Sequence, residues 1–248
     1  MANPPLTTRR TSFGIAPGRK IGRRYVVEAV LGAGSEGEVY QIRELNTDIR
    51  RAAKLYFAHR DPRGQLAVRH AQKLNRLRHC PIVLQYHHSE VVTIARQPVV
   101  AMISELCPGE QLEQWVFGHR GRRLHPYQAL HVFYELVRGL EAVHAAGEYH
   151  SDVHVQNILV QPRGVRFELK LIDFYDWGPP ARYKQKQDIV DAVRVFYDCL
   201  GGRAAYARQA AELRWIIAGL KHTLILKRFT TMASLRSHLE SFAWSGLE

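Results

Sequence analysis

Residues 150–160 of the chain read His-Ser-Asp-Val-His-Val-Gln-Asn-Ile-Leu-Val. The apolar run at the end predicts a short buried strand, and the polar residues before it predict a tight loop. In such a loop Asp152 and Asn157 can face one point. There the aspartate would accept a proton from a hydroxyl group, and the asparagine oxygen would ligate a metal ion.

A second acid follows a second predicted strand. Residues 169–172 are apolar and are followed by Asp173-Phe174-Tyr175. An aspartate at the end of a buried strand is costly unless it is paired, and a magnesium ion that bridges phosphate groups is a suitable partner. We therefore expect Asp173 to be a metal ligand together with Asn157, and Asp176 offers a further carboxylate nearby.

A glycine-rich segment precedes this region. Residues 32–39 read Gly-Ala-Gly-Ser-Glu-Gly-Glu-Val and lie between two strand-like runs. These flanks favour a β-hairpin lid over phosphates rather than the strand-to-helix turn of dinucleotide-binding folds. Gly32, Gly34 and Gly37 would let backbone N–H groups approach phosphate oxygens, because glycine has no Cβ. Taken alone, the segment would also fit an ordinary hairpin.

A lysine in the next strand-like run completes the phosphate-binding candidates. Lys54 lies between Ala53 and Leu55, which is a poor position for a solvated charge. The position fits a lysine that points into a cleft and neutralises phosphate charge. A lysine at a strand edge is the alternative interpretation.

The pattern of apolar residues changes near Pro108. Before it, strand-like runs cover 25–31, 38–43, 51–57, 84–94 and 99–105, and one helix is predicted at 65–77. After it, helices are predicted at 127–146, 188–200, 204–220 and 232–242, with short strands at 158–160 and 169–172. The sequence predicts an α+β fold with a five-stranded β lobe at 25–108 and a larger, mainly α-helical lobe at 109–248.

Residues 1–24 are basic, contain no acid and lack apolar periodicity. We interpret them as a disordered tail with candidate phosphoacceptors at Thr7, Thr8, Thr11 and Ser12. Prolines in this segment argue against the helix of an organellar presequence.

Composition excludes several classes of protein. Hydrophobic residues make up 46% of the chain, which argues against wholesale disorder, and the apolar runs are too short for the roughly 18 residues of a membrane span. The three cysteines offer neither a disulfide framework nor paired metal ligands, which favours a reducing compartment. The net charge of +12 is scattered and comes with no zinc-finger or RNP motif, so we expect neither a nucleic-acid nor a membrane partner.

In order and spacing, these segments resemble the protein kinases over about residues 25–242. The resemblance is to a minimal bacterial serine/threonine kinase that lacks a full activation segment. It implies transfer of the γ-phosphate of ATP to a protein hydroxyl with Mg²⁺ or Mn²⁺, in the cytoplasm of a bacterium or as a secreted effector. Lys54 would hold the α- and β-phosphates, Asp152 would be the catalytic base, and Asn157 and Asp173 would bind the metal.

The resemblance also implies an adenine site. Residues 104–107, Ser-Glu-Leu-Cys, match the kinase hinge, so main-chain groups of Glu105 and Cys107 would pair with adenine. The adenine ring would lie between Val39, Ala53 and Leu159.

Two further positions match structural residues of the family. Asp188, which opens the run Asp-Ile-Val-Asp-Ala-Val, resembles the aspartate that braces the catalytic loop. Arg228-Phe229 resembles the closing motif of the helical lobe.

Four departures bear on activity. The first concerns the helix at 65–77, which contains no acid and places His70 where the family has the glutamate that pairs with the lysine. Glu36, Glu38 or Asp173 could orient Lys54 instead. Loss of activity is the alternative, and it would leave a pseudokinase that binds nucleotide as an adaptor.

The catalytic loop departs as well, because it reads His-Ser-Asp and lacks the arginine that receives a phosphorylated activation loop. His154 replaces the usual lysine, and such loops are similar to those of aminoglycoside-phosphotransferase-like kinases. A small-molecule kinase is therefore an alternative function.

The segment after Asp173 differs in two ways. Tyr175 stands where the family has glycine, and only 14 residues separate Asp173 from Asp188, with no Ala-Pro-Glu motif. Arg228, which usually pairs with the glutamate of that motif, must find another partner or face solvent. Much of the peptide-docking segment is thus missing, so the protein substrate is open, and the basic tail is an expected autophosphorylation site.

Overall fold

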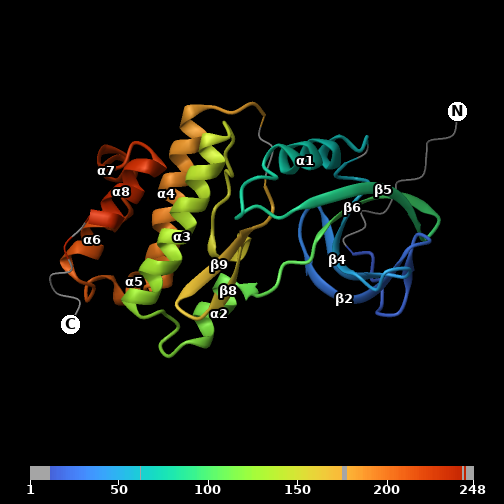
Figure 1. Cartoon of the computed structure of the whole chain (residues 1–248), viewed down its shortest axis with the longest axis horizontal. Helices are drawn as coiled ribbons and strands as arrows, with labels where there is room; N and C mark the ends of the chain where they lie inside the picture. The colour runs from blue at the N-terminus through green and yellow to red at the C-terminus, as the bar shows by residue number, and fades with distance from the viewer. Residues whose placement is uncertain (1–11, 62, 175–177, 242, 244–248) are drawn as a thin grey trace, which may run out of the picture. The chain divides into compact units, whose positions relative to one another are not determined.

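The computed structural model describes residues 12–61, 63–174, 178–241 and 243 (Figure 1). Its contacts divide the chain into two compact units. The first comprises Met1–Asn75 with Gln85–Leu106, and the second comprises Arg76–Leu84 with Cys107–Glu248. The predicted α+β class is confirmed, because the first unit is built on an antiparallel sheet and the second is mainly helical.

The first unit contains a six-stranded antiparallel sheet in the order β1-β2-β3-β4-β6-β5. Its strands are Lys20–Ile21 (β1), Tyr25–Ala33 (β2), Gly37–Glu44 (β3), Arg50–Tyr56 (β4), Tyr86–Ile94 (β5) and Gln97–Glu105 (β6). The prediction of five strands is wrong by one. The additional strand β1 is only two residues long, and it forms because Lys20 and Ile21 pair with Val26 and Tyr25.

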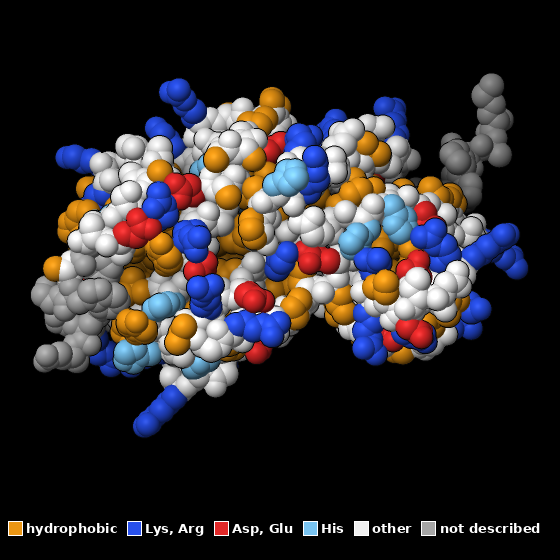
Figure 2. All heavy atoms as spheres, in the orientation of Figure 1, with side chains coloured by type: hydrophobic (Ala, Val, Ile, Leu, Met, Phe, Trp, Pro, Cys, Tyr) orange, Lys and Arg blue, Asp and Glu red, His pale blue; other side chains and the backbone are white. Residues whose placement is uncertain are grey.

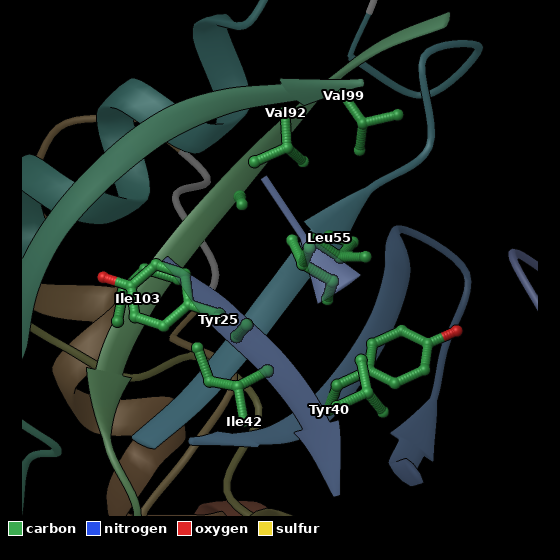
Figure 3. Close-up of a cluster of buried hydrophobic side chains, with 11 residues drawn as sticks. Tyr25, Tyr40, Ile42, Leu55, Val92, Val99 and Ile103 are labelled. Carbon is green, nitrogen blue, oxygen red and sulfur yellow. The ribbon is translucent and has the colours of Figure 1, made fainter. Parts of the chain in front are cut away.

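Alternation of side chains along these strands builds the core of the first unit. Tyr40 and Ile42, two residues apart on β3, are fully buried, as the two-residue period of a strand requires. Leu55 of β4 is fully buried as well. Figure 3 shows Tyr25, Ile42, Leu55 and Ile103 gathered on the inner face of the curved sheet.

The first described residues pack on this sheet. The Phe13 N–H donates to the Glu38 carboxylate at 2.8 Å, and the Phe13 ring stacks on Phe57 with centroids 5.0 Å apart. Ile15 also packs against the core. The disorder predicted for residues 1–24 therefore does not extend over residues 12–24, where Phe13 and Ile15 pack against the core and β1 pairs with β2. The candidates Thr7, Thr8 and Thr11 lie outside the described residues.

One helix, α1 at Gln65–Arg76, accompanies the sheet in the first unit. Asp61 caps its start, because its carboxylate oxygens accept the N–H groups of Leu66 and Ala67 at 3.0 and 2.9 Å. Leu74 and His70 lie on the buried face of the helix.

The second unit is built around α3 at Pro126–Ala145, which packs against α4 at Arg182–Cys199 and α8 at Met232–Ser241. The rings of Phe133 and Phe196 stack at 4.5 Å in this core. The other elements are β7 (Glu110–Gln111), α2 (Leu112–Gly118), β8 (Ile158–Arg163), β9 (Arg166–Leu171), α5 (Gly202–Tyr206), α6 (Ala211–Ile217), α7 (His222–Arg228) and 3₁₀ turns at Val155–Asn157 and Ala218–Leu220.

The predicted helices of this unit differ from the structure in three ways. The helix predicted at 204–220 is broken into α5, α6 and a 3₁₀ turn, because its buried residues leave a gap between Ala205 and Leu213 that the apolar pattern bridged. Helix α4 begins at Arg182, ahead of the predicted 188, since its first turns are polar. Helices α2 and α7 were missed because each has only two turns.

Basic side chains are spread over the face of the molecule that Figure 2 shows, and they do not gather into one patch there. Within the described residues, no helix has both the length and the hydropathy that crossing a bilayer requires.

We expect Phe13→Ala to destabilise the protein. The change removes the ring that stacks on Phe57 and packs against the core, and a partly buried aromatic ring contributes about 1–2 kcal/mol. For a chain of this size that loss lowers the melting temperature by roughly 2–8 °C. Thermal denaturation measures it, with Val91→Ala, which truncates an exposed side chain of β5, as the control. An unchanged melting temperature would contradict the packing of residues 12–24.

Candidate active site

A buried carboxylate on α4 holds the loop that contains Asp152. Asp188 is fully buried, and its two oxygens accept the N–H groups of His150 and Ser151, each at 2.8 Å. His144 of α3 lies 2.9 Å from the same carboxylate through Nε2. Charge-assisted bonds to a buried acid are strong, so Asp188 braces this loop as the sequence predicted. The contribution of His144 was missed, because nothing in the sequence connects it with Asp188.

His150 connects the loop to the end of β9. Its Nδ1 accepts the Asp152 N–H at 3.2 Å, so its Nε2 carries the proton and donates to the Ile172 carbonyl at 3.0 Å. The His150 ring also lies 4.3 Å from the ring of Phe174. These contacts fix the residues on either side of Asp173.

Asn157 and His154 both face the Asp152 carboxylate. Asn157 Nδ2 donates to the Asp152 carbonyl at 3.0 Å and to Oδ2 at 3.1 Å. His154 Nδ1 accepts the Gln156 N–H at 3.3 Å, which places the Nε2 proton on the side of Asp152 Oδ2, 3.5 Å away. The Asp152 side chain is 40% exposed, so an oriented carboxylate is open to an incoming hydroxyl group.

Asp173 and Asn157 are brought together by the backbone. The Ile172 N–H donates to the Asn157 carbonyl at 3.0 Å, which places Asp173 directly beside the end of the loop. Asp173 has a φ of 56°, a left-handed conformation that costs a non-glycine residue of order 1 kcal/mol and often occurs at functional sites. Tyr175 and Asp176 lie outside the described residues.

The donor set fits a magnesium ion. No cluster of three or more His, Cys, Asp or Glu side chains suited to a metal occurs in the described parts of the chain. Asn157 Nδ2 donates to Asp152, which leaves Asn157 Oδ1 available for a cation, and Asp173 adds a carboxylate. One or two protein oxygens completed by phosphate oxygens are typical of Mg²⁺ sites in phosphoryl-transfer enzymes.

The glycine-rich segment forms the predicted hairpin between β2 and β3, and its turn is closed by a 2.9 Å bond from the Gly34 N–H to the Gly37 carbonyl. A Cβ at Gly37 would lie 1.9 Å from the Leu55 carbonyl oxygen, so the fold itself requires this glycine. A Cβ at Gly32 or Gly34 would meet nothing within 4 Å, so packing does not require glycine at these two positions.

Lys54 of β4 has a carboxylate partner in this hairpin. Its Nζ lies 2.8 Å from Glu36 Oε2, with exposed fractions of 11% for the lysine side chain and 19% for the glutamate side chain. Glu36, one of the three acids that the sequence offered, thus contacts Lys54. The Glu38 carboxylate is instead bonded to the Tyr40 hydroxyl and the Phe13 N–H. Burial would raise the pKa of Glu38, but donors from Ser12, Tyr40 and Phe13 outweigh it and lower the pKa.

Helix α1 supplies no acid to Lys54. His70 is buried, and its Nδ1 lies 2.7 Å from the Tyr56 hydroxyl. The histidine therefore ties α1 to β4, two residues beyond Lys54.

The predicted adenine contacts are distributed over the two units. Glu105 belongs to the first unit, where it exchanges two bonds with Gln85, 2.9 Å from its N–H to the carbonyl and 2.8 Å from the Gln85 N–H to its carboxylate. Its N–H is thus engaged in the fold. Ala53 is buried and Val39 half-buried in this unit, whereas Cys107 and Leu159 are half-buried residues of the second.

Arg228 finds a partner that the sequence did not indicate. Its guanidinium donates to the Trp215 carbonyl and lies 4.3 Å from the centroid of the Trp215 ring. A cation–π contact with this tryptophan occupies the arginine that other family members pair with a glutamate.

The fold and the loop around Asp152 are those of the kinase type, and comparison identifies the family. The chain belongs to the protein kinase domain family, whose model matches residues 25–193. The relatives that it resembles are serine/threonine kinases.

Two of these relatives come from Streptomyces coelicolor. The probable serine/threonine-protein kinase SCO3848 is 31% identical over 159 residues, which cover 63% of this chain and 23% of the relative. The kinase PkaB is 32% identical over 150 residues, 59% of this chain and 34% of the relative. The chain therefore spans about a quarter to a third of the curated relatives it matches.

Among solved structures, a double mutant of the Mycobacterium tuberculosis PknI kinase domain matches with a TM-score of 0.66. The match has 16% identity and covers 92% of this chain and 98% of that one. At this identity the likeness shows a shared fold.

Asp191 lies one turn beyond Asp188 on α4. We expect this residue to make the stability of the protein depend on pH. Burial raises its pKa to about 6, with the charges of Asp188 and Asp152 adding to the effect and a hydrogen bond from Gln187 opposing it. A raised carboxyl pKa means that the folded state holds the proton more tightly. Its stabilising contribution is full below pH ~4 and is lost as the pH rises through about 6.

We therefore expect Asp191→Asn, which stays neutral and can still accept from Gln187, to melt at a higher temperature than the wild type at pH 7.5. The two proteins should melt together near pH 4. Thermal denaturation at several pH values measures the difference, and a gap independent of pH would contradict the assignment.

Proposed function

We propose that the protein is a kinase that uses ATP with Mg²⁺ or Mn²⁺ to phosphorylate serine or threonine hydroxyls of a protein. One observation carries the proposal: the exposed Asp152 carboxylate is oriented by Asn157 at 3.1 Å in a loop that Asp188 braces. A carboxylate held in this way is suited to accept the proton of an attacking hydroxyl.

The proposed roles of the other site residues follow from their positions. Asn157 and Asp173 would hold the metal ion, which supplies neutralisation of phosphate charge when it is bound. Lys54 would donate to the α- and β-phosphates beneath the hairpin of Gly32, Gly34 and Gly37. The Glu105 carbonyl and the Cys107 N–H would pair with adenine, and Val39, Ala53 and Leu159 would contact its ring.

A small-molecule kinase is the second candidate. His154 favours it, because a histidine 3.5 Å from Asp152 Oδ2 resembles the loops of aminoglycoside-phosphotransferase-like enzymes. A pseudokinase adaptor would be favoured if Lys54 lacked an orienting acid. The 2.8 Å contact with Glu36 therefore supports an enzyme over an adaptor.

The test is transfer of label from γ-labelled ATP, with Mg²⁺ or Mn²⁺, to the protein itself and to a generic serine- and threonine-rich acceptor. We expect Asp152→Asn to lower the rate by about 10²–10⁴-fold, because the general base is lost. Lys54→Ala should also lower it strongly. Glu168→Gln, which removes an exposed acid of β9, is the control and should label like the wild type.

Equal labelling by the wild type and by Asp152→Asn would contradict the proposal. Label found only on added aminoglycosides or other small hydroxyl compounds would favour the second candidate. A melting temperature raised by ATP without any transfer would favour the adaptor.

A further inference from the structure

The acid that orients Lys54 comes from the hairpin that would cover the phosphates. We propose that Glu36 is the positioning residue for Lys54, so that the glycine-rich hairpin, and not helix α1, aligns the phosphate-binding lysine. The inference rests on the proposed kinase function and adds to it the residue that replaces the missing helix acid.

The Lys54–Glu36 pair is shielded from solvent. The 2.8 Å contact joins side chains that are 11% and 19% exposed, so water and salt screen it less than a surface pair. An ammonium group has three donors, and a bond to Glu36 uses one of them. A carboxylate at this distance can thus orient the lysine without saturating it.

The main chain of Glu36 is fixed as well. Its carbonyl accepts the Phe57 N–H at 2.8 Å, and the neighbouring turn is closed by the Gly34–Gly37 bond at 2.9 Å. Phe57 follows the end of β4, the strand that carries Lys54. Glu36 is therefore joined to the β4 segment at two points, through its main chain to Phe57 and through its side chain to Lys54. Together these contacts hold the carboxylate beside the lysine.

Glu38 and helix α1 do not offer this contact. Helix α1 contains no acidic residue, and its His70 is engaged 2.7 Å from the Tyr56 hydroxyl. Glu38, the next acidic residue of the hairpin, is buried, and its carboxylate accepts hydrogen bonds from the Tyr40 hydroxyl and the Phe13 N–H. Val39 is the residue of β3 that pairs with Lys54, so these two side chains lie on the same face of the sheet. Successive side chains of a strand point to opposite faces, so Glu38 lies on the other face.

A positioning role predicts which kinetic constant changes. A lysine that loses its orienting acid still carries its charge and still attracts ATP, but it no longer meets the phosphates in the geometry of the transition state. Small misplacements of this kind lower rates by about 10–100-fold. We expect Glu36→Gln to lower kcat by that factor while KM for ATP changes less than about threefold.

The experiment compares kcat and KM for ATP in the wild type and four variants, of which Glu36→Gln is the first. Glu36→Asp, which keeps the charge, should recover part of the rate lost in Glu36→Gln. Glu44→Gln removes the same charge from the far end of β3 and should behave like the wild type. His70→Gln, which retains a hydrogen-bonding group for Tyr56, should also keep its kcat.

An unchanged kcat in Glu36→Gln would overturn the inference, as would a loss in His70→Gln as large as that in Glu36→Gln. A second readout does not depend on phosphate transfer: the rate at which an amine-reactive reagent labels Lys54, followed by mass spectrometry. Loss of the Glu36 contact should increase labelling of Lys54 at least severalfold, with no change in Glu44→Gln. If the wild type transfers no phosphate, the proposed function fails, and equal labelling in Glu36→Gln would still refute the pairing separately.

Discussion

The structure of the loop that contains Asp152 depends on its hydrogen bonds to the buried carboxylate of Asp188. That carboxylate accepts two main-chain N–H groups of the loop at 2.8 Å and lies 2.9 Å from His144. One of those N–H groups belongs to Ser151, whose φ of 74° is unfavourable for a residue with a Cβ. The hydrogen bonds to Asp188 offset that strain. The loop is thus held from α4, without the arginine that usually couples it to a phosphorylated segment.

From this brace, a chain of contacts extends to the residues that would react. His150, held at its N–H, accepts from Asp152 and donates to Ile172 at the end of β9. Asn157 orients the Asp152 carboxylate and is bonded through its carbonyl to Ile172. These hydrogen bonds lie in a partly buried region, where a polar group without a partner costs free energy. They therefore restrict the orientation of the groups that they join. The orientation of the Asp152 carboxylate therefore depends on the whole loop.

In the first unit the main constraint is the position of the Lys54 ammonium group. Lys54 lies on a strand whose neighbours pack into the core, so its ammonium group needs an acid close by. Helix α1 offers His70 instead, and that histidine bonds to Tyr56. The acid comes from Glu36 across the hairpin, within the same unit. The hairpin that is expected to cover phosphate thus also carries a counter-ion of Lys54.

Sequence patterns alone predicted the class of fold, the hairpin of the glycine-rich segment and the loop that contains Asp152 and Asn157. These features rest on local patterns, namely the two-residue period of strands, the freedom of glycine and polar residues spaced along one turn. Tertiary structure decided which acid meets Lys54, how Arg228 is satisfied by Trp215, and that residues 12–24 pack on the sheet. The sequence offered Glu36, Glu38 and Asp173 as equals, because local spacing does not reveal side-chain directions across a sheet. Only packing showed that Glu38 turns to Phe13 while Glu36 turns to the lysine.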